Sequence, residues 1–318
     1  MSIAGLAKEN IALMFAYATS PVLRQIARHR EDMPRFQRYI DGAGFQIRSG
    51  HYYEPTYSES DLPADTSVER PLPGLDLNES AQLDLISRFV FADELKTIPL
   101  EKPSEDQFGY RNPMYGFGDA EVYYSMIRLK KPKRIIEIGS GQSTLMAGLA
   151  VKANQQDDPD YVCERICIEP YEMAWLESTG VSVIRQRVET VDLAIFATLQ
   201  ADDILFVDSS HVIRPWGDVL REFQEIIPGL NPGVMVHVHD IFTPRDYPES
   251  WLRDRRRLWN EQYLLESFLA FNSRFEIICA LNWLKNHHGE AMARACPMLG
   301  DHPEANPGAF WFRRKLDD

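Results

Sequence analysis

The C-terminal two thirds of the chain alternate between short apolar runs and longer segments with helical spacing. Short β-branched runs predict strands, and apolar residues that recur every three to four positions predict helices. The predicted strands span 134–138, 165–168, 181–184, 204–207, 234–238, 275–281 and 309–312. Helices are predicted over 144–152, 188–199, 216–227 and 260–271. This alternation predicts an α/β fold with a mainly parallel sheet, whose ligands bind at the carboxyl ends of the strands.

The N-terminal third follows a different pattern. Helical spacing extends over 3–39 and 80–95, with a loop-like stretch between them and Asn78 as the predicted N-cap of the second segment. We therefore expect a helical N-terminal extension or lid over residues 1–104 and the α/β domain over residues 105–318.

Composition and charge argue against several classes of protein. The 318 residues carry a net charge of −13, so we do not expect the basic surface that nonspecific nucleic-acid binding requires. The longest apolar runs fall short of the roughly 20 residues of a membrane span, and the run at 11–17 is interpreted as an amphipathic helix rather than a signal peptide. The four cysteines form no C-x-x-C pattern. We expect a cytoplasmic protein that binds neither nucleic acid nor membrane.

The end of the first predicted strand carries a glycine-rich turn. Glu137 precedes Gly139 and Gly141, and two glycines allow a tight turn close to a ligand. The dinucleotide fingerprint needs a third glycine, and Thr144 stands in that place. A carboxylate at Glu137 is unfavourable beside a pyrophosphate and favourable beside a cationic amino group.

Three more strand ends carry polar residues. Glu169 follows the second strand, where a carboxylate can bind a ribose diol. Asp208 follows the fourth strand, three residues before His211, and His239 and Asp240 follow the fifth. Asp208, His239 and Asp240 could hold a divalent cation, with Mg²⁺ or Mn²⁺ as candidates. His211 or His239 could instead act as a general base, and a bracing polar cluster is the structural alternative. His237, deeper in the strand, is interpreted as a core residue.

In this order and spacing, the motifs resemble those of class I S-adenosylmethionine (SAM)-dependent methyltransferases, in particular the bacterial branch found in natural-product and surface-glycan gene clusters. The resemblance covers residues 105–315 best, and four stretches carry it: 135–144, 203–211, 236–242 and 259–265. It implies a Rossmann-like fold with a seven-stranded, mostly parallel sheet and helices on both faces.

The resemblance also implies site residues. Glu137, Gly139, Ser140 and Gly141, with Ser143 and Thr144 from the same loop, would surround the methionine part of SAM. The ribose would lie at Glu169 and the adenine near Val188 and Glu189. Asp208, counted with the cofactor residues, and Asp240 match positions that ligate Mg²⁺ in metal-dependent relatives. Residue 239 departs from those relatives, because it is histidine where a carboxylate or another oxygen ligand is usual.

The expected activity is methyl transfer from SAM to a small-molecule or glycan acceptor, with oxygen as the preferred nucleophile. His211, His239 and Asp240 are the candidate catalytic residues. Four aromatic residues after the fifth strand either form the acceptor pocket or pack a lid: Tyr247, Trp251, Trp259 and Tyr263. The basic run 253–257 is either a binding site for an anionic acceptor or a solvated surface. A nicotinamide-dependent oxidoreductase and a non-catalytic SAM-binding protein are the alternatives. The oligomeric state, including a homo-oligomer, stays open.

Overall fold

The computed structural model describes residues 3–49, 51, 53–171 and 173–316. The chain divides into two compact units, residues 1–64 and 65–318. The boundary between the units, after residue 64, lies earlier in the chain than the boundary predicted after residue 104. The reason is that the two helices between residues 64 and 104 pack on the second unit. There α3 (Glu79–Ser87) contacts strand β6, and α4 (Ala92–Thr97) contacts helix α12.

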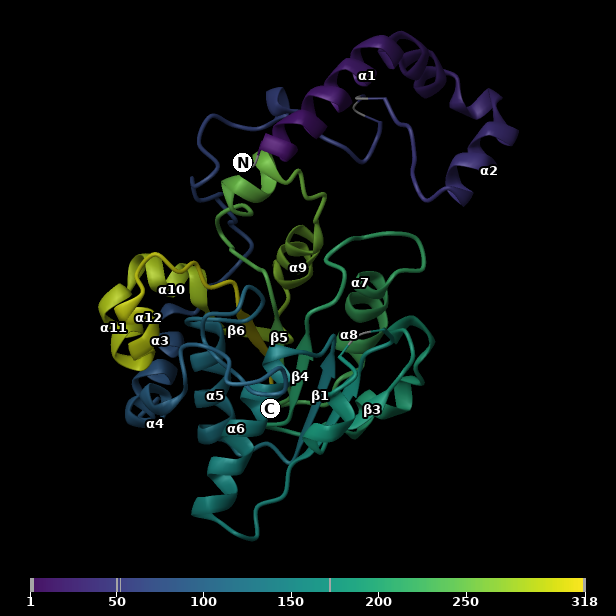
Figure 1. Ribbon diagram of the computed structural model, residues 1–318. Coiled ribbons are helices and arrows are strands. Elements are labelled where there is room, and N and C mark those ends of the chain that lie inside the picture. Colours follow the sequence, from purple (N-terminus) through teal and green to yellow (C-terminus); the bar gives the residue numbers. More distant parts are fainter. Residues whose placement is uncertain (1–2, 50, 52, 172, 317–318) are drawn as a thin grey trace. The chain divides into compact units, whose positions relative to one another are not determined.

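The first unit is mainly helical. Helix α1 (Ile3–Arg28) is followed by a short 3-10 turn and by α2 (Pro34–Gly42), in purple in Figure 1. An extended segment then returns to α1's end, where Glu54 pairs with Arg30 at 2.7 Å and with Arg48 at 3.0 Å. The predicted helical N-terminal extension is thus present in its first forty residues.

The second unit is built on one sheet of seven strands, in the order β3-β2-β1-β4-β5-β7-β6. Its strands are β1 (Arg134–Ile138), β2 (Glu164–Ile168), β3 (Ser182–Ile184), β4 (Ile204–Val207), β5 (Met235–Val238), β6 (Phe275–Ala280) and β7 (Phe310–Arg314). Only β7 runs antiparallel to its neighbours. The predicted seven-stranded, mostly parallel α/β fold is confirmed.

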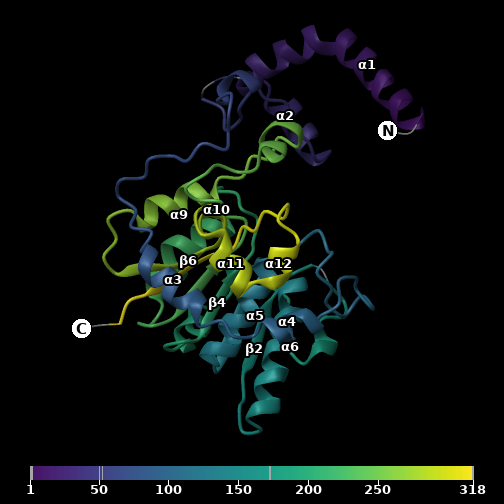
Figure 2. The same ribbon diagram turned by 90° about the vertical axis from the view of Figure 1, so that its left-hand side faces the viewer.

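Helices cover both faces of this sheet (Figures 1 and 2). On one face α5 (Asp119–Lys130) packs against α6 (Gln142–Asp157). On the other, α9 (Glu261–Leu269) packs against a π-helical turn at Glu222–Ile226, which lies between the short helices α7 (Asp218–Arg221) and α8 (Ile227–Gly229). The remaining helices, between β6 and β7, are α10 (Leu281–His287), α11 (Gly289–Ala295) and α12 (Pro297–Asp301).

One local prediction was wrong and another holds in position only. The segment predicted as a helix over 188–199 forms two 3-10 turns, Val188–Thr190 and Leu193–Thr198. Asn78 stands at the N-cap of α3, as predicted, but its side chain makes no capping hydrogen bond and instead donates to the carbonyl of Ile277 at 3.2 Å. A long-range contact thus replaces the local side-chain cap at Asn78.

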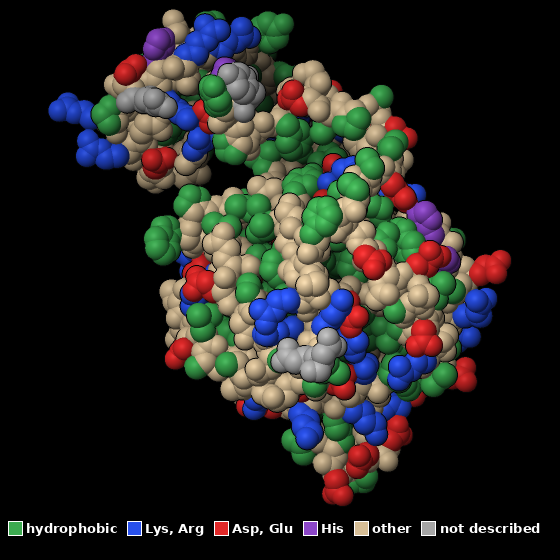
Figure 3. All heavy atoms as spheres, turned by 180° about the vertical axis from the view of Figure 1, so that it is seen from behind, with side chains coloured by type: hydrophobic (Ala, Val, Ile, Leu, Met, Phe, Trp, Pro, Cys, Tyr) green, Lys and Arg blue, Asp and Glu red, His purple; other side chains and the backbone are tan. Residues whose placement is uncertain are grey.

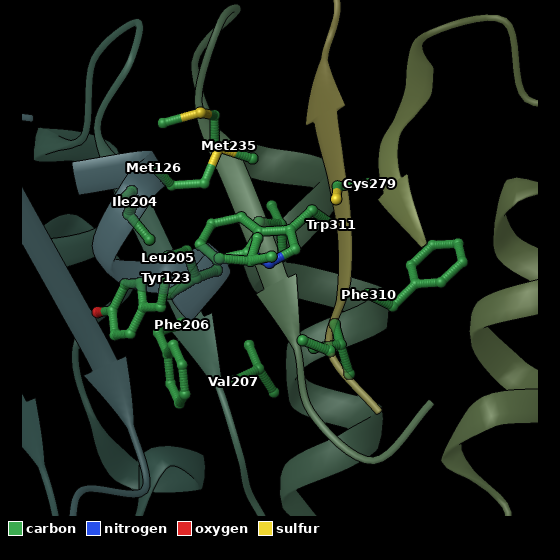
Figure 4. Packing of buried hydrophobic residues seen from close by; sticks show 14 of the residues in the cluster. Tyr123, Met126, Ile204, Leu205, Phe206, Val207, Met235, Cys279, Phe310 and Trp311 are labelled. Carbon is green, nitrogen blue, oxygen red and sulfur yellow. The ribbon is translucent and has the colours of Figure 1, made fainter. Parts of the chain in front are cut away.

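The core is centred on β4 and β5, which are buried along their whole length as parallel strands usually are. The buried first three residues of the antiparallel β7 complete it. Figure 4 shows Tyr123 and Met126 from α5 beside Phe206 and Trp311 from the sheet. His237 belongs to this core: its ring stacks on Phe206 with centroids 4.0 Å apart. Burial lowers the pKa of His237 well below its ordinary value, so this histidine is neutral, as its prediction as a core residue requires.

The surface mixes charges of both signs. Figure 3 shows acidic and basic side chains interspersed over one face of the molecule. Among the residues that the structure describes, none of the helices is long and apolar enough to cross a membrane.

Candidate active site

The register of the sheet brings the four predicted strand ends to one level. Ile138 of β1 pairs with Ile168 of β2 and with Val207 of β4, and Val207 pairs with Val238 of β5. The residues that follow these four strands are Gly139, Glu169, Asp208 and His239. They form a row along one edge of the sheet, where ligands of open α/β sheets bind.

Gly139 is required where this edge turns into α6. Its φ is +77°, and a Cβ added there would lie 1.9 Å from the carbonyl oxygen of Asp208. Only glycine adopts this conformation at this separation without strain. The turn brings the β1 and β4 ends together, and the Ser140 amide then donates to the Glu169 carboxylate at 3.4 Å.

Two cavities open along the row and share Gly139, Glu169, Asp208, Ser209 and Ser210. The first has a volume of about 470 Å³ and extends past Val188 and Glu189. The second, about 360 Å³, extends past Ser140, Gly141 and Ser143 to His211, His239 and Asp240. All predicted cofactor residues except Glu137 and Thr144 therefore line one of two joined spaces, and their contacts with a cofactor stay predictions.

Glu137 and Thr144 lie behind the turn rather than at the cavities. The Glu137 carboxylate accepts hydrogen bonds from Thr144 Oγ1 at 2.6 Å and from the Tyr123 hydroxyl at 3.3 Å. Thr144 Oγ1 in turn accepts from the Gly141 amide at 3.1 Å. Burial raises the pKa of Glu137. The structure gives these two residues a role in shaping the loop, whereas a direct contact with a bound amino group stays a prediction.

The loop offers polar atoms to a ligand. Ser140 Oγ and Gln142 Oε1 are buried and have no hydrogen-bond partner among the described residues, and both residues line the second cavity. Gly141 leaves open space, since an added Cβ would meet nothing nearer than Met173 Cε at 3.9 Å. A polar ligand with an adenosine-like part in the first cavity and a charged tail in the second fits these features, as SAM does.

The cluster of carboxylates and imidazoles predicted from the sequence is present. His211 Nε2 lies 3.2 Å from Asp208 Oδ1 and 3.8 Å from Asp240 Oδ2. His239 Nδ1 lies 3.4 Å from Asp208 Oδ2 and 3.9 Å from Asp240 Oδ2. His211 and Asp240 both have positive φ, +59° and +57°. Such strained backbone outside glycine concentrates at functional sites.

Two members of the cluster were missed by the sequence. Glu261, at the start of α9, places Oε2 2.8 Å from His211 Nδ1 in a fully buried contact. Asp119, at the start of α5, places Oδ2 3.6 Å from His239 Nε2 and accepts a hydrogen bond from the Ala309 amide at 2.7 Å. Both lie far along the chain from the imidazoles they contact, and no local pattern marks them. Glu261 does fall within the stretch 259–265 that resembles the methyltransferases.

The charges in this cluster are coupled. Burial opposes ionisation of Asp208, but the imidazoles of His239 and His211 outweigh it and hold the pKa of Asp208 well below its ordinary value. Burial likewise disfavours the His211 imidazolium, yet hydrogen bonds to Asp208 and Glu261 raise the pKa of His211 to about 10. Burial raises the pKa of Asp240. In the ligand-free protein His211 is therefore protonated at neutral pH.

The predicted metal site is not supported. Asp208, His239 and Asp240 do lie together, but among the residues that the structure describes no three His, Cys, Asp or Glu side chains are arranged to hold a metal ion. The imidazoles occupy the space between the carboxylates, as ion-pair partners.

The aromatic residues after β5 divide into two groups. Trp251 and Trp259 line the second cavity, as expected for an acceptor pocket. Tyr247 and Tyr263 are held away from it, since the Tyr247 hydroxyl accepts from the Gln262 amide at 3.1 Å and the Tyr263 hydroxyl donates to Asp246 at 2.6 Å.

Comparison with known proteins agrees with this site. Residues 136–241, which contain the row of strand ends, match a family model for a methyltransferase domain, Methyltransf_24. An uncharacterized protein of Archaeoglobus fulgidus is 28% identical over 169 residues, which cover 49% of this chain and 74% of that protein. The match places a methyltransferase domain over the segment that contains the strand-end row.

Solved structures with similarity to this chain are methyltransferases as well. The O-methyltransferase TomG of Streptomyces achromogenes, involved in tomaymycin synthesis and solved with SAM, is 16% identical with a TM-score of 0.38, covering 73% of this chain and 90% of its own. An O-methyltransferase of Bacillus cereus, solved with SAH, is 12% identical with a TM-score of 0.36, covering 73% of this chain and 91% of its own.

Proposed function

We propose that the protein transfers the methyl group of SAM to an oxygen of a small-molecule or glycan acceptor, with His211 as the general base. The contact between His211 and Glu261 carries this proposal. A buried carboxylate on Nδ1 fixes the ring and its tautomer, and Nε2 is left on the cavity side beside Asp208 and Asp240.

SAM supplies an activated methyl group, so the protein has to align the acceptor and remove its proton. The acceptor would enter the second cavity, between the Trp251–Trp259 side and the turn at Gly139. Its hydroxyl would give its proton to His211 Nε2 as the methyl group is transferred. Asp240 and His239, on the same wall, would orient the hydroxyl.

His211 must be neutral to accept that proton. Its pKa of about 10 describes the ligand-free protein, in which two carboxylates face the ring. A sulfonium bound beside Asp208 would offset part of that negative charge, and His211 would lose its proton more readily. Cofactor binding would thus prepare the base, because a like charge nearby disfavours the imidazolium and lowers its pKa.

The test is the formation of S-adenosylhomocysteine from SAM with a panel of hydroxylated aromatic and sugar acceptors. Substituting His211→Gln should lower the rate by about 10²- to 10⁴-fold, the usual contribution of a general base, with SAM affinity kept. Turnover that survives this substitution would remove His211 from the mechanism. SAM binding without turnover on any acceptor would instead favour the alternative of a non-catalytic SAM-binding protein.

The proposal also covers the location and the partners of the enzyme. We propose that it acts in the cytoplasm on a free small molecule or glycan, with neither nucleic acid nor membrane as partner. The net charge of −13 and the mixed surface charges support this choice. A homo-oligomer is compatible with it, and sedimentation of the purified protein tests that.

A further inference from the structure

The loop between β5 and α9 holds an arginine between two tryptophans. The Arg257 guanidinium carbon lies 4.2 Å from the ring centroid of Trp251 and 4.0 Å from that of Trp259. The two indoles meet edge to face, with centroids 5.1 Å apart and an interplanar angle of 82°. Stacking of this kind fixes a guanidinium in place through cation–π attraction.

Backbone hydrogen bonds also hold the Arg257 loop in this conformation. The Arg257 amide donates to the carbonyl of Trp251 at 2.9 Å, so the loop folds back on itself. At its far end, the amides of Asn260 and Glu261 both donate to the carbonyl of His211. The Trp259 ring lies 4.2 Å from the His211 ring. The stacked arginine is therefore linked to the proposed base through the Trp259 ring.

This arginine faces the reaction space. Arg257 and Arg255 line the same cavity as Asp208, His211 and Asp240. Their neighbours do not: Arg253 pairs with Glu249 at 2.9 Å, and Arg256 is exposed outside the cavity. The basic run from 253 to 257 thus places Arg255 and Arg257 at the cavity and Arg256 at the exposed surface.

From this placement we infer that the acceptor carries an anionic group, a carboxylate or a phosphate, which the Arg257 guanidinium binds while the acceptor hydroxyl faces His211. The inference rests on the proposed function and names its class of substrate. Stacking engages the faces of a guanidinium, and hydrogen bonding to an anion uses its edge, in a planar fork that matches carboxylate and phosphate. Arg257, with Arg255 on the same cavity, would select such a substrate against neutral analogues.

The experiment compares matched ligands on the enzyme loaded with S-adenosylhomocysteine, by isothermal titration calorimetry. The pairs are 3,4-dihydroxybenzoate with its methyl ester, glucuronate with glucose, and glucose 6-phosphate with glucose. The first two pairs test a carboxylate and the third a phosphate. The anionic member of at least one pair should bind about tenfold tighter or more, the usual effect of a charge-assisted hydrogen bond.

Three variants test whether Arg257 causes the preference for anionic ligands. Arg257→Gln should abolish the preference, and Arg257→Lys should keep only part of it, because lysine keeps the charge without the planar fork. Arg256→Gln is the matched control and should keep the preference in full. The affinity for S-adenosylhomocysteine and the melting temperature should be unchanged in all three.

The experiment distinguishes a failure of this inference from a failure of the proposed function. Equal binding of the anionic and neutral members in every pair, with S-adenosylhomocysteine bound, would overturn this inference and leave the proposed function standing. Weaker binding of S-adenosylhomocysteine to the Arg257→Gln variant would overturn it as well, because the arginine would then hold the carboxylate of the cofactor. A wild-type protein that does not bind S-adenosylhomocysteine would contradict the proposed function itself.

Discussion

His211 Nδ1 and Glu261 Oε2 lie 2.8 Å apart, and both side chains are buried. The contact joins the loop after β4 to the first residue of α9, 50 positions further along the chain. It leaves the other nitrogen of His211 at the cavity wall. Catalytic imidazoles are commonly held this way, with a carboxylate behind the ring and the reacting group in front of it.

Replacing Glu261 by glutamine should therefore act through His211. Removal of the carboxylate charge lowers the pKa of His211, so the rising limb of the pH–rate profile should move to lower pH. The turnover number should fall by about 10²-fold or more, because the ring is less firmly oriented. Steady-state kinetics between pH 6 and pH 10 with saturating SAM measure the pH profile and the turnover number. The control is Glu249→Gln, which removes a carboxylate from an ion pair with Arg253. An unchanged pH–rate profile in Glu261→Gln would contradict the proposed role of the His211–Glu261 contact.

The stability of the protein should depend on pH through the same imidazole. The pKa of His211 is raised from 6.5 to about 10 in the folded protein. A raised pKa stabilises the fold below the unfolded value and loses that contribution as the pH rises through the folded value. The melting temperature should therefore fall between pH 7 and pH 10, and His211→Gln should flatten this decline. An equally steep decline in the variant would show that other groups cause it.

Gly139→Ala should disrupt the cofactor turn. The added methyl group would meet the Asp208 carbonyl at 1.9 Å in a conformation with φ at +77°. The strain alone costs about 1–3 kcal/mol, and we expect a lower melting temperature together with loss of S-adenosylhomocysteine binding. Gly229→Ala is the control, since nothing lies within 4 Å of its added Cβ. Normal binding by Gly139→Ala would mean that the cofactor does not use this turn.

Removal of metal ions should leave the activity unchanged. The arrangement of Asp208, His239 and Asp240 does not provide a set of ligands for a metal ion in the described part of the chain. Dialysis against EDTA, followed by addition of Mg²⁺ or Mn²⁺ alone, should give one rate throughout. A rate that is lost on chelation and restored by one ion would reinstate the metal site predicted from the sequence.

The sequence predicted the sheet and the row of strand ends because these depend on local patterns. Apolar runs mark β1, β4 and β5, and the residues directly after them are Gly139, Asp208 and His239. Once the strands are parallel and in register, these residues must meet at one edge. The core position of His237 follows from its place deeper in the strand, two residues before His239.

What the sequence could not predict depends on contacts between distant segments. Glu137 turns toward Thr144 and Tyr123 because α5 and α6 pack over β1. Glu261 and Asp119 reach the cluster from α9 and α5, and Arg257 becomes part of the cavity only because the loop folds back onto Trp251. None of these placements has a signal in periodicity or spacing, since each is set by tertiary packing.

Isothermal titration calorimetry of the purified protein tests most directly whether SAM is the cofactor. We predict saturable binding of S-adenosylhomocysteine, one molecule per chain, and no binding of NAD(H) or NADP(H). Binding of a nicotinamide cofactor in place of S-adenosylhomocysteine would contradict it.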